Sequence, residues 1–191
     1  MECQFPKRKS TRLQNFDYSK AGAYFVTICT ADRQKLLSEI VFTNDTEADG
    51  LAVQGEIPSP EYSVKLTPCG KIAKEQLLLL EHRFQGLAIT DYVIMPDHIH
   101  AIIFLHNNDK ALVEATGGAS PSPTLNDVLC AFKSLTSRIC KKQYGTAKIF
   151  QRSFADHIIR DGADYETRKK YIYENPMRWY YTHATPRSPQ W

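Results

Sequence analysis

The segment from Met95 to Leu105 constrains the fold more than any other part of the chain. It reads Met-Pro-Asp-His-Ile-His-Ala-Ile-Ile-Phe-Leu, and an apolar run from Leu87 to Met95 leads into it. Two apolar runs that are separated by only Pro96 and Asp97 predict an antiparallel hairpin. Because the residues after His100 are all apolar, the second strand of this hairpin is expected to lie inside a sheet.

Two histidines stand at the beginning of this second strand. His98 and His100 are two positions apart, so on a strand they point to the same side and a single metal ion could reach both imidazoles. Local hydrogen bonding without any chemistry is the alternative interpretation. A zinc hydrolase is also compatible with the pair, whereas a histidine-triad nucleotide hydrolase is disfavoured, because Ile102 occupies the position of a third alternating histidine.

The rest of the chain alternates strand and helix patterns. Strands are expected at 23–31, 36–42, 87–95, 98–105 and within 149–160. Helices are expected from Pro68 to Gly86, from a Thr124 cap to Gly145, and from an Asp164 cap to Asn175 before Pro176. The order β, β, α, β, β, α, β, α predicts an α+β fold of ferredoxin-like character, an antiparallel sheet with helices on one face.

Length and composition indicate one intracellular domain. The chain has 191 residues, a net charge of +3, and five cysteines that form no CxxC pair, so neither a disulfide framework nor a cysteine zinc site is expected. No secretory signal or membrane span is recognisable, and a cytoplasmic location is expected. The predicted division is a basic arm at 1–22, one catalytic domain at 23–178 with loops at 43–60 and 106–123, and a C-terminal tail at 179–191.

The last predicted helix carries a second group of reactive side chains. Tyr171 and Asn175 are four positions apart and share a helix face, which Arg168 joins from three positions before Tyr171. A tyrosine can attack a phosphate, an amide oxygen can bind a metal, and an arginine can hold a phosphate. The alternative is that these tyrosines only pack, with their hydroxyl groups in water.

Taken together, these motifs resemble a known family. His98-Ile-His100 matches the His-hydrophobic-His motif of HUH endonucleases, and the stretch from Tyr171 to Pro176 resembles the tyrosine helix of REP-associated tyrosine transposases, which belong to the single-tyrosine HUH transposases. The stretches from Asp17 to Thr30 and from Phe150 to Arg160 agree as well. The four motifs occur in the family's order and span roughly residues 8–178.

The resemblance implies a ferredoxin-like domain with the histidines on a central strand. It implies that His98, His100 and Asn175 bind Mg²⁺ or Mn²⁺ and that Tyr171 attacks DNA, which gives a 5′-phosphotyrosine and a free 3′-hydroxyl. The substrate would be single-stranded DNA beside a short hairpin, and relatives often act as homodimers. His157 lies in a matching motif, and three roles stay open for it: ordering the site, contacting DNA or packing.

Basic residues extend this expectation to DNA binding. The predicted backbone contacts are Lys7, Arg8, Lys9, Arg12, Arg152 and Arg168. Two other functions remain open. One is a domesticated module that binds hairpin DNA without cutting it, and the other is a metal-dependent phosphohydrolase that uses the histidines alone. The sequence identifies no general base for Tyr171.

Overall fold

The computed structural model describes residues 21–43, 61–106, 123–146 and 148–183. The predicted loops at 43–60 and 106–123 and the basic residues Lys7, Arg8, Lys9 and Arg12 lie almost entirely outside these ranges. The described elements are β1 (Gly22–Cys29), the 3-10 turn η1 (Ala31–Arg33), β2 (Ser38–Thr43), β3 (Glu61–Leu66), α1 (Pro68–Leu78), α2 (Leu80–Arg83), β4 (Leu87–Ile94), β5 (His98–Leu105), α4 (Leu125–Tyr144), β6 (Ala155–Ile159) and α5 (Gly162–His183).

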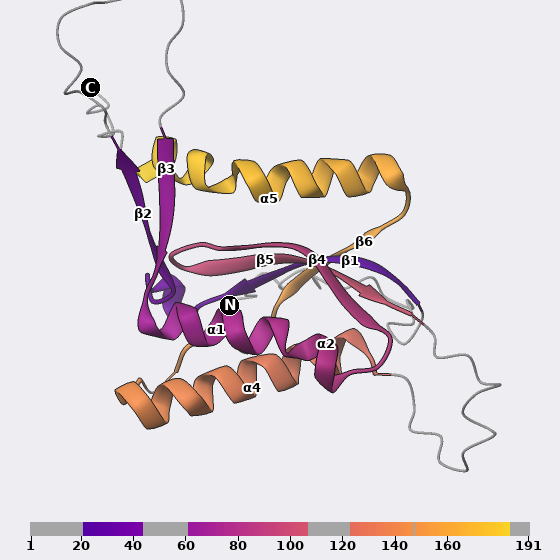
Figure 1. Ribbon diagram of the computed structural model, residues 1–191, viewed down its shortest axis with the longest axis horizontal. Helices are drawn as coiled ribbons and strands as arrows, with labels where there is room; N and C mark the ends of the chain where they lie inside the picture. The colour runs from indigo at the N-terminus through magenta and orange to yellow at the C-terminus, as the bar shows by residue number, and fades with distance from the viewer. Residues whose placement is uncertain (1–20, 44–60, 107–122, 147, 184–191) are drawn as a thin grey trace, which may run out of the picture.

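A four-stranded antiparallel sheet forms the centre of the molecule, with the strand order β4-β5-β1-β6 (Figure 1). The predicted hairpin is β4–β5, and β5, which carries both histidines, is an interior strand as expected. A separate two-stranded ribbon pairs β2 with β3. The strand β3 was not predicted, because its alternating side chains directly follow the polar stretch that was read as a loop.

Helices cover both faces of the sheet. Figure 1 shows α1, α2 and α4 on one side and α5 on the other. The α+β class and the antiparallel sheet are therefore confirmed, while the expectation that all helices share one face is corrected. The reason lies in β5, where Ile99, Ala101 and Ile103 belong to one apolar cluster and Ile102 belongs to another. Because both faces of this strand are apolar, both must be covered.

The two apolar layers differ greatly in size. The main core, between the sheet and α1 and α4, includes large and fully buried side chains such as Tyr24, Leu77 and Phe132. Among the described residues, the apolar cluster under α5 has three buried members, Phe25, Ile102 and Ile172. Hydrophobic burial therefore fixes α1 and α4 much more firmly than α5.

Two helices begin at the residues that the sequence predicts. The Thr67 side chain accepts a hydrogen bond from the Gly70 backbone N–H at the start of α1. Thr124 and Asp127 form a capping box at the start of α4, and Gly145 ends that helix in the left-handed conformation, with a φ of 68°. These caps satisfy backbone groups that a helix end otherwise leaves without partners.

Helix α5 differs from the prediction at both ends. Its first turn is capped by Asp161, whose Oδ1 accepts from the Asp164 backbone N–H at 2.8 Å, so Asp164 is not the cap. The helix also continues through Pro176 to His183, and residues 179–183 of the predicted tail are therefore helical. A proline inside a helix costs about 3 kcal/mol. Here Pro176 is buried, and the next turn packs against the sheet layer through Trp179 and His98.

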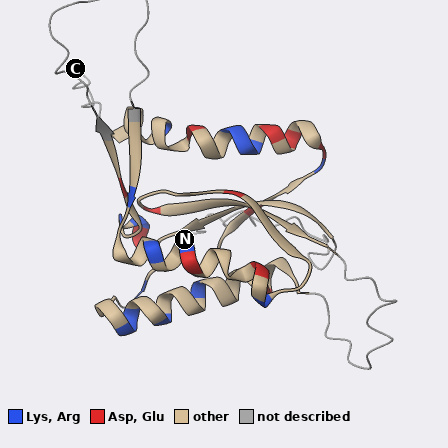
Figure 2. Cartoon of the chain, viewed as in Figure 1, with Lys and Arg blue, Asp and Glu red and all other residues tan. Residues whose placement is uncertain are grey.

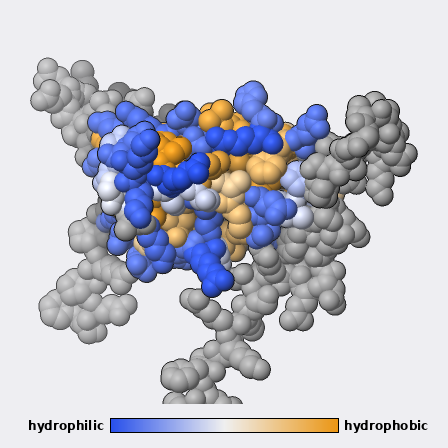
Figure 3. All heavy atoms as spheres, turned by 90° about the horizontal axis from the view of Figure 1, so that it is seen from below, coloured by the Kyte–Doolittle hydropathy of each residue, from blue (hydrophilic) through white to orange (hydrophobic). Residues whose placement is uncertain are grey.

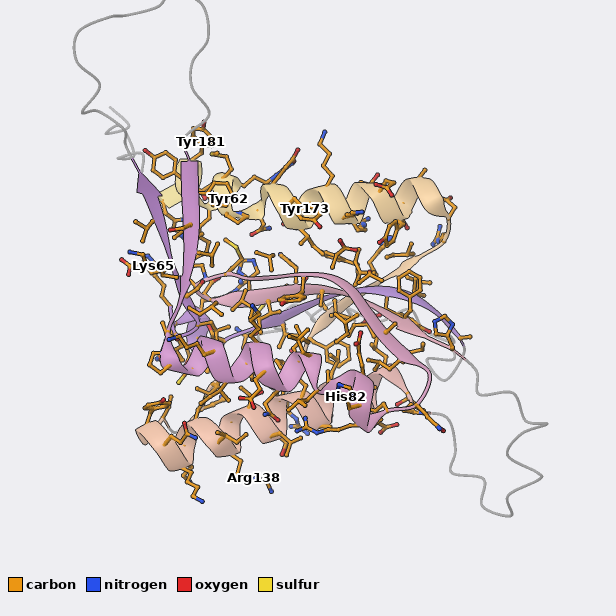
Figure 4. All side chains as sticks on the ribbon, in the orientation of Figure 1. Tyr62, Lys65, His82, Arg138, Tyr173 and Tyr181 are labelled. Atoms are coloured by element: carbon orange, nitrogen blue, oxygen red, sulfur yellow. The ribbon has the colours of Figure 1, made fainter. Side chains whose placement is uncertain are left out.

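Charged side chains lie mainly on the helices, and the central strands carry few (Figure 2). Helix α4 is strongly basic, with Lys133, Arg138, Lys141 and Lys142 against the single acid Asp127. Figure 4 shows Arg138 pointing away from the molecule. The view from below in Figure 3 shows hydrophilic side chains with apolar ones between them. None of the helices among the described residues combines the length and apolar character that crossing a membrane requires.

Candidate active site

His98 and His100 form a buried pair at the beginning of β5. Their ring centroids are 4.6 Å apart, and the rings are inclined at 72°. The residues are only 8% and 4% exposed, respectively. The two-residue spacing on a strand places both rings on the α5 side of the sheet, as the sequence predicts.

Each imidazole makes its hydrogen bond through Nδ1. His98 Nδ1 pairs with Oδ1 of Asp97, and His100 Nδ1 lies 2.9 Å from the hydroxyl oxygen of Thr27, its partner residue on β1. Such second contacts fix the orientation of a metal-binding imidazole and leave the other ring nitrogen to the metal. The histidines do hydrogen-bond locally, but the side-chain hydrogen bonds of both rings use Nδ1 and not Nε2.

The electrostatic environment favours the neutral form of His100. Burial, with a further contribution from the neighbouring His98, lowers the pKa of His100 from 6.5 to about 3. A neutral imidazole keeps the lone pair that a metal needs, so His100 can act as a ligand at neutral pH without losing a proton first.

Helix α5 places Tyr171 and Asn175 over this pair. The Tyr171 ring centroid is 5.2 Å from that of His100, and the Trp179 ring centroid is 6.2 Å from that of His98. Asn175 is four positions from each of these aromatic residues and so lies between them on the same helix face. It is 6% exposed, and within the described structure its side-chain amide makes no hydrogen bond.

The available donors fit one divalent cation. No group of three or more His, Cys, Asp or Glu side chains suited to a metal occurs among the described residues. A metal would therefore be held by two imidazole nitrogens and the Asn175 amide oxygen, with positions left for phosphate oxygens. Donors of this kind suit Mn²⁺ and Mg²⁺, and the Asn175 amide, which makes no hydrogen bond within the described structure, is available for such a role.

Aromatic and cationic side chains surround the Tyr171 ring. Phe25 stacks on His100 with centroids 5.1 Å apart and meets Tyr171 edge-on at 5.9 Å. The Arg178 guanidinium carbon lies 5.4 Å from the Tyr171 ring centroid. These contacts hold the ring, while no described residue hydrogen-bonds to its hydroxyl group. The oxygen is therefore free to meet a substrate.

His157 and Arg168 belong to one cluster with Asp164. His157 Nε2 is 2.7 Å from Asp164 Oδ2, and Arg168 Nε donates to Asp164 Oδ1 at 3.2 Å. The Arg168 guanidinium also lies 5.7 Å from the Phe25 ring centroid. This cluster ties β6 to the first turns of α5, which favours the site-ordering role among the three that were open for His157.

Arg152 lies apart from this cluster. It is exposed on the segment before β6, where its carbonyl accepts from Lys133 Nζ at 2.7 Å. Within the described structure, its side chain has no contact with the histidine pair. Its predicted contact with DNA stays a prediction.

The site residues that were not predicted include Asp97, Thr27 and Trp179. Asp97 directly precedes His98, so its contact could have been proposed from adjacency alone. Trp179 could have been found by continuing the four-residue spacing from Asn175, had Pro176 not been taken as the end of the helix. Thr27 depends on the register between β1 and β5, which the sequence does not reveal.

Two curated proteins are similar to this chain in sequence. No protein-family model matches the chain. An uncharacterized protein of Haemophilus influenzae is 26% identical over 180 residues, covering 90% of this chain and 89% of its own. A second protein of that organism, named "Putative REP-associated tyrosine transposase", is 25% identical over 168 residues, which cover 85% of this chain and 74% of its own.

A solved structure shares the fold. It is a REP-associated tyrosine transposase bound to a REP hairpin, with a TM-score of 0.54 and 20% identity, covering 88% of this chain and 74% of its own. The resemblance to REP-associated tyrosine transposases that the motifs indicate is thereby confirmed in sequence and in fold.

Proposed function

We propose that this transposase-like protein cuts and rejoins single-stranded DNA beside hairpins through a 5′-phosphotyrosine intermediate on Tyr171. One observation carries the proposal. Residues from two distant elements, His98 and His100 on β5 and Tyr171 and Asn175 on α5, meet on one face of the sheet. The similarity to a named REP-associated tyrosine transposase supports the reaction class, and the hairpin in the related structure supports the substrate.

The chain would provide a nucleophile and a site that orients the phosphate. The Tyr171 oxygen would attack the phosphorus, its proton would leave to solvent, and the bond from phosphorus to the 3′ oxygen would break, with the departing oxygen taking up a proton from solvent. The products are a phosphotyrosine at the 5′ end and a free 3′-hydroxyl. The reverse attack by a 3′-hydroxyl would rejoin the strand and release Tyr171. Because each step exchanges one phosphodiester for another, rejoining needs no nucleotide cofactor.

His98, His100 and Asn175 would hold Mg²⁺ or Mn²⁺ beside this phosphate. When bound, the cation would polarise the phosphate and neutralise charge that develops during attack. Asp97 and Thr27 would orient the two imidazoles, and burial would keep His100 neutral and ready to bind.

The decisive experiment uses labelled single-stranded hairpin oligonucleotides with Mn²⁺, resolved on a denaturing gel. The expected result is a slow-migrating covalent adduct that requires the metal and is absent from the Tyr171→Phe and His98→Ala variants. Tyr144→Phe is the matched control, because this exposed tyrosine lies on α4 across the sheet from the site.

Other outcomes would favour the alternatives. Cleavage that persists in Tyr171→Phe would indicate a metal-dependent phosphohydrolase that uses the histidines alone. Tight hairpin binding without adduct or cleavage would indicate a binding module. The present geometry favours neither, because the tyrosine and the amide are both placed over the histidines.

A further inference from the structure

Asp91 is a buried carboxylate that faces the tyrosine helix and takes no part in the proposed chemistry. It lies on β4 and is 7% exposed. The Tyr165 hydroxyl donates to its Oδ2 at 2.8 Å, and the Tyr173 hydroxyl donates to its Oδ1 at 3.2 Å. Both carboxylate oxygens are therefore satisfied by hydroxyl groups of one helix. We refer to Asp91, Tyr165 and Tyr173 as the Asp91 clamp.

A β-bulge puts Asp91 on this face. The pairing of β4 with β5 shifts between Ile89, opposite Ile103, and Asp91, opposite Ile102, so Thr90 is an extra and exposed residue. In a regular strand Asp91 would point to the same side as Ile89, into the main core. The bulge directs it instead to the side of α5, and bulges commonly redirect side chains near functional sites.

The Asp91 clamp restrains the part of α5 that carries the proposed nucleophile. Tyr165 and Tyr173 are eight positions apart on the helix and bracket Tyr171, which has Tyr173 two positions beyond it. Two bonds from separate turns to one fixed carboxylate oppose both rotation of the helix about its axis and sliding along it. The Tyr62 hydroxyl on β3 adds a bond to the Tyr173 carbonyl at 3.2 Å, and Figure 4 labels both residues.

Apolar packing alone would fix this orientation poorly. Ile172 is the one fully apolar side chain of α5 in the small buried cluster, besides the partly buried rings of Tyr165 and Tyr171. Hydrophobic contact is not directional, whereas hydrogen bonds to a carboxylate are strong and geometrically specific. The direction in which α5 faces therefore depends on polar contacts.

We infer that Asp91 is a positioning residue that sets the rotation and height of α5, so that Tyr171 and Asn175 face His98 and His100. Its effect on cleavage rests on the proposed function. The role of Asp91 in orienting α5 does not depend on the proposed function, because it follows from the two hydrogen bonds. The prediction is that loss of the clamp leaves DNA binding intact but misplaces the nucleophile.

The test compares the double variant Tyr165→Phe/Tyr173→Phe with Tyr144→Phe and with Asp91→Asn. The chain has two tryptophans, and every protein in the test carries Trp191→Phe, so Trp179 is the single tryptophan and is excited selectively at a wavelength that tyrosine does not absorb. Trp179 lies on α5 against His98, and its quenching by acrylamide therefore reports how α5 is seated. Circular dichroism verifies that each variant is folded.

The double variant is expected to show greater Trp179 quenching. Its single-turnover adduct formation should be slower by about 10- to 100-fold, because small misplacements of reacting groups have effects of this size. Hairpin affinity should stay within about threefold, and Tyr144→Phe should match the parent protein. Asp91→Asn keeps one acceptor oxygen and should retain most of the parent rate of adduct formation. A variant that had lost its fold could not retain this rate.

The outcomes separate this inference from the proposed function. Unchanged Trp179 quenching and an unchanged rate in the double variant would overturn the positioning role. If the parent protein forms no adduct while quenching rises in the double variant, the clamp stands and the proposed function falls. If the double variant unfolds, each single tyrosine variant removes only one hydrogen bond. Trp179 quenching and the rate of adduct formation in each single variant are then compared with those of the parent protein.

Discussion

At the scale of single residues, the histidine pair depends on neighbours that do not contact the metal position. Asp97, in the turn before β5, and Thr27, on β1, each occupy one Nδ1. The orientation of the rings is therefore a property of the β1–β5 pairing as well as of the His-x-His spacing. Substitutions at these neighbours should change metal affinity without removing a ligand.

Thr27→Val tests this directly. Valine has nearly the same shape but no hydroxyl, so the His100 ring loses its hydrogen bond while the strand keeps its packing. Mn²⁺ affinity is expected to fall by about 10- to 100-fold, as is usual when such an outer contact is lost. Mn²⁺ quenching of Trp179 fluorescence measures it, and Thr167→Val, an exposed helix hydroxyl bonded to Ala163, is the control. Equal affinities in both variants would contradict the role of Thr27.

Asp164 should give the fold a dependence on acid. The hydrogen bond with His157, together with that from Arg168, holds the pKa of Asp164 below its usual 3.8. A carboxyl group with a lowered pKa stabilises the folded state above its unfolded pKa, and this contribution disappears as the pH falls through the folded pKa. Asp164→Asn should therefore be less stable than the parent at pH 7, and the gap should close below about pH 3.8. Thermal melts between pH 7 and 2.5 measure the difference in stability between the parent and Asp164→Asn. A purely steric effect of the substitution would leave this difference constant with pH.

At the scale of elements, the start of α1 is packed against the β1–β2 connection with no space to spare. A Cβ atom at Gly70 would lie 1.8 Å from the Leu37 carbonyl oxygen. The same carbonyl accepts a hydrogen bond from the Thr67 backbone N–H, so this contact cannot shift without loss of a bond at the helix cap. The close approach fixes where α1 meets the ribbon.

Gly70→Ala is therefore expected to destabilise the fold by about 1–3 kcal/mol or more, as overpacking of a rigid contact does. Gly162→Ala is the matched control, because it also adds a methyl group at the start of a helix but has nothing within 4 Å. Urea unfolding of both variants provides the comparison. If Gly70→Ala is as stable as Gly162→Ala, the backbone at Leu37 can move away from position 70 at little cost in free energy.

The sequence predicts elements well where periodicity and caps agree. The strand β5 and the helix α4 were both predicted within a residue of their bounds, since the first has an apolar alternation with a clear break and the second has Thr124 and Gly145 at its ends. Helix α5 was predicted too short, because the local rule for Pro176 is outweighed by tertiary packing. For the site, the spacing identifies His98 and His100.

Other parts of the site could not be predicted, because they depend on three-dimensional register. Simple alternation would assign Asp91 to the main core, and the bulge at Thr90 has no distinctive sequence signal. The contact between Thr27 and His100 likewise requires the pairing of two strands that are far apart in the chain. Local sequence patterns identify the reactive side chains. The residues that orient them can be identified only once the pairing of the strands is known.

At the scale of the whole molecule, the sheet separates a large apolar layer from a small one. The strands β1 and β5 contribute to the main core, whereas α5 packs on the sheet through a cluster with three buried apolar residues, one of them its own Ile172, and through several polar contacts. Elements with few buried apolar contacts open at lower free energy than the core. The molecule should therefore have one stable half and one half that opens more readily.

Amide hydrogen exchange measures this difference. Amides of α5 are expected to exchange through an opening of lower free energy than those of β1 and β5, in the protein without DNA. The amides of α4 serve as the internal control, because this helix lies on the main core and should resemble the strands. Equal protection of α5 and α4 would mean that the whole chain unfolds as a single unit.

The ribosome completes the two halves of the proposed active site at different times. Roughly 70 residues separate His100 from Tyr171, and at about 5–20 residues per second the histidine strand precedes the tyrosine by about 4–14 seconds. During that interval β1, β4 and β5 can already pair, but the nascent chain has no nucleophile. A protein of this design would acquire its ability to break DNA only after its two histidine ligands and most of its core have been made.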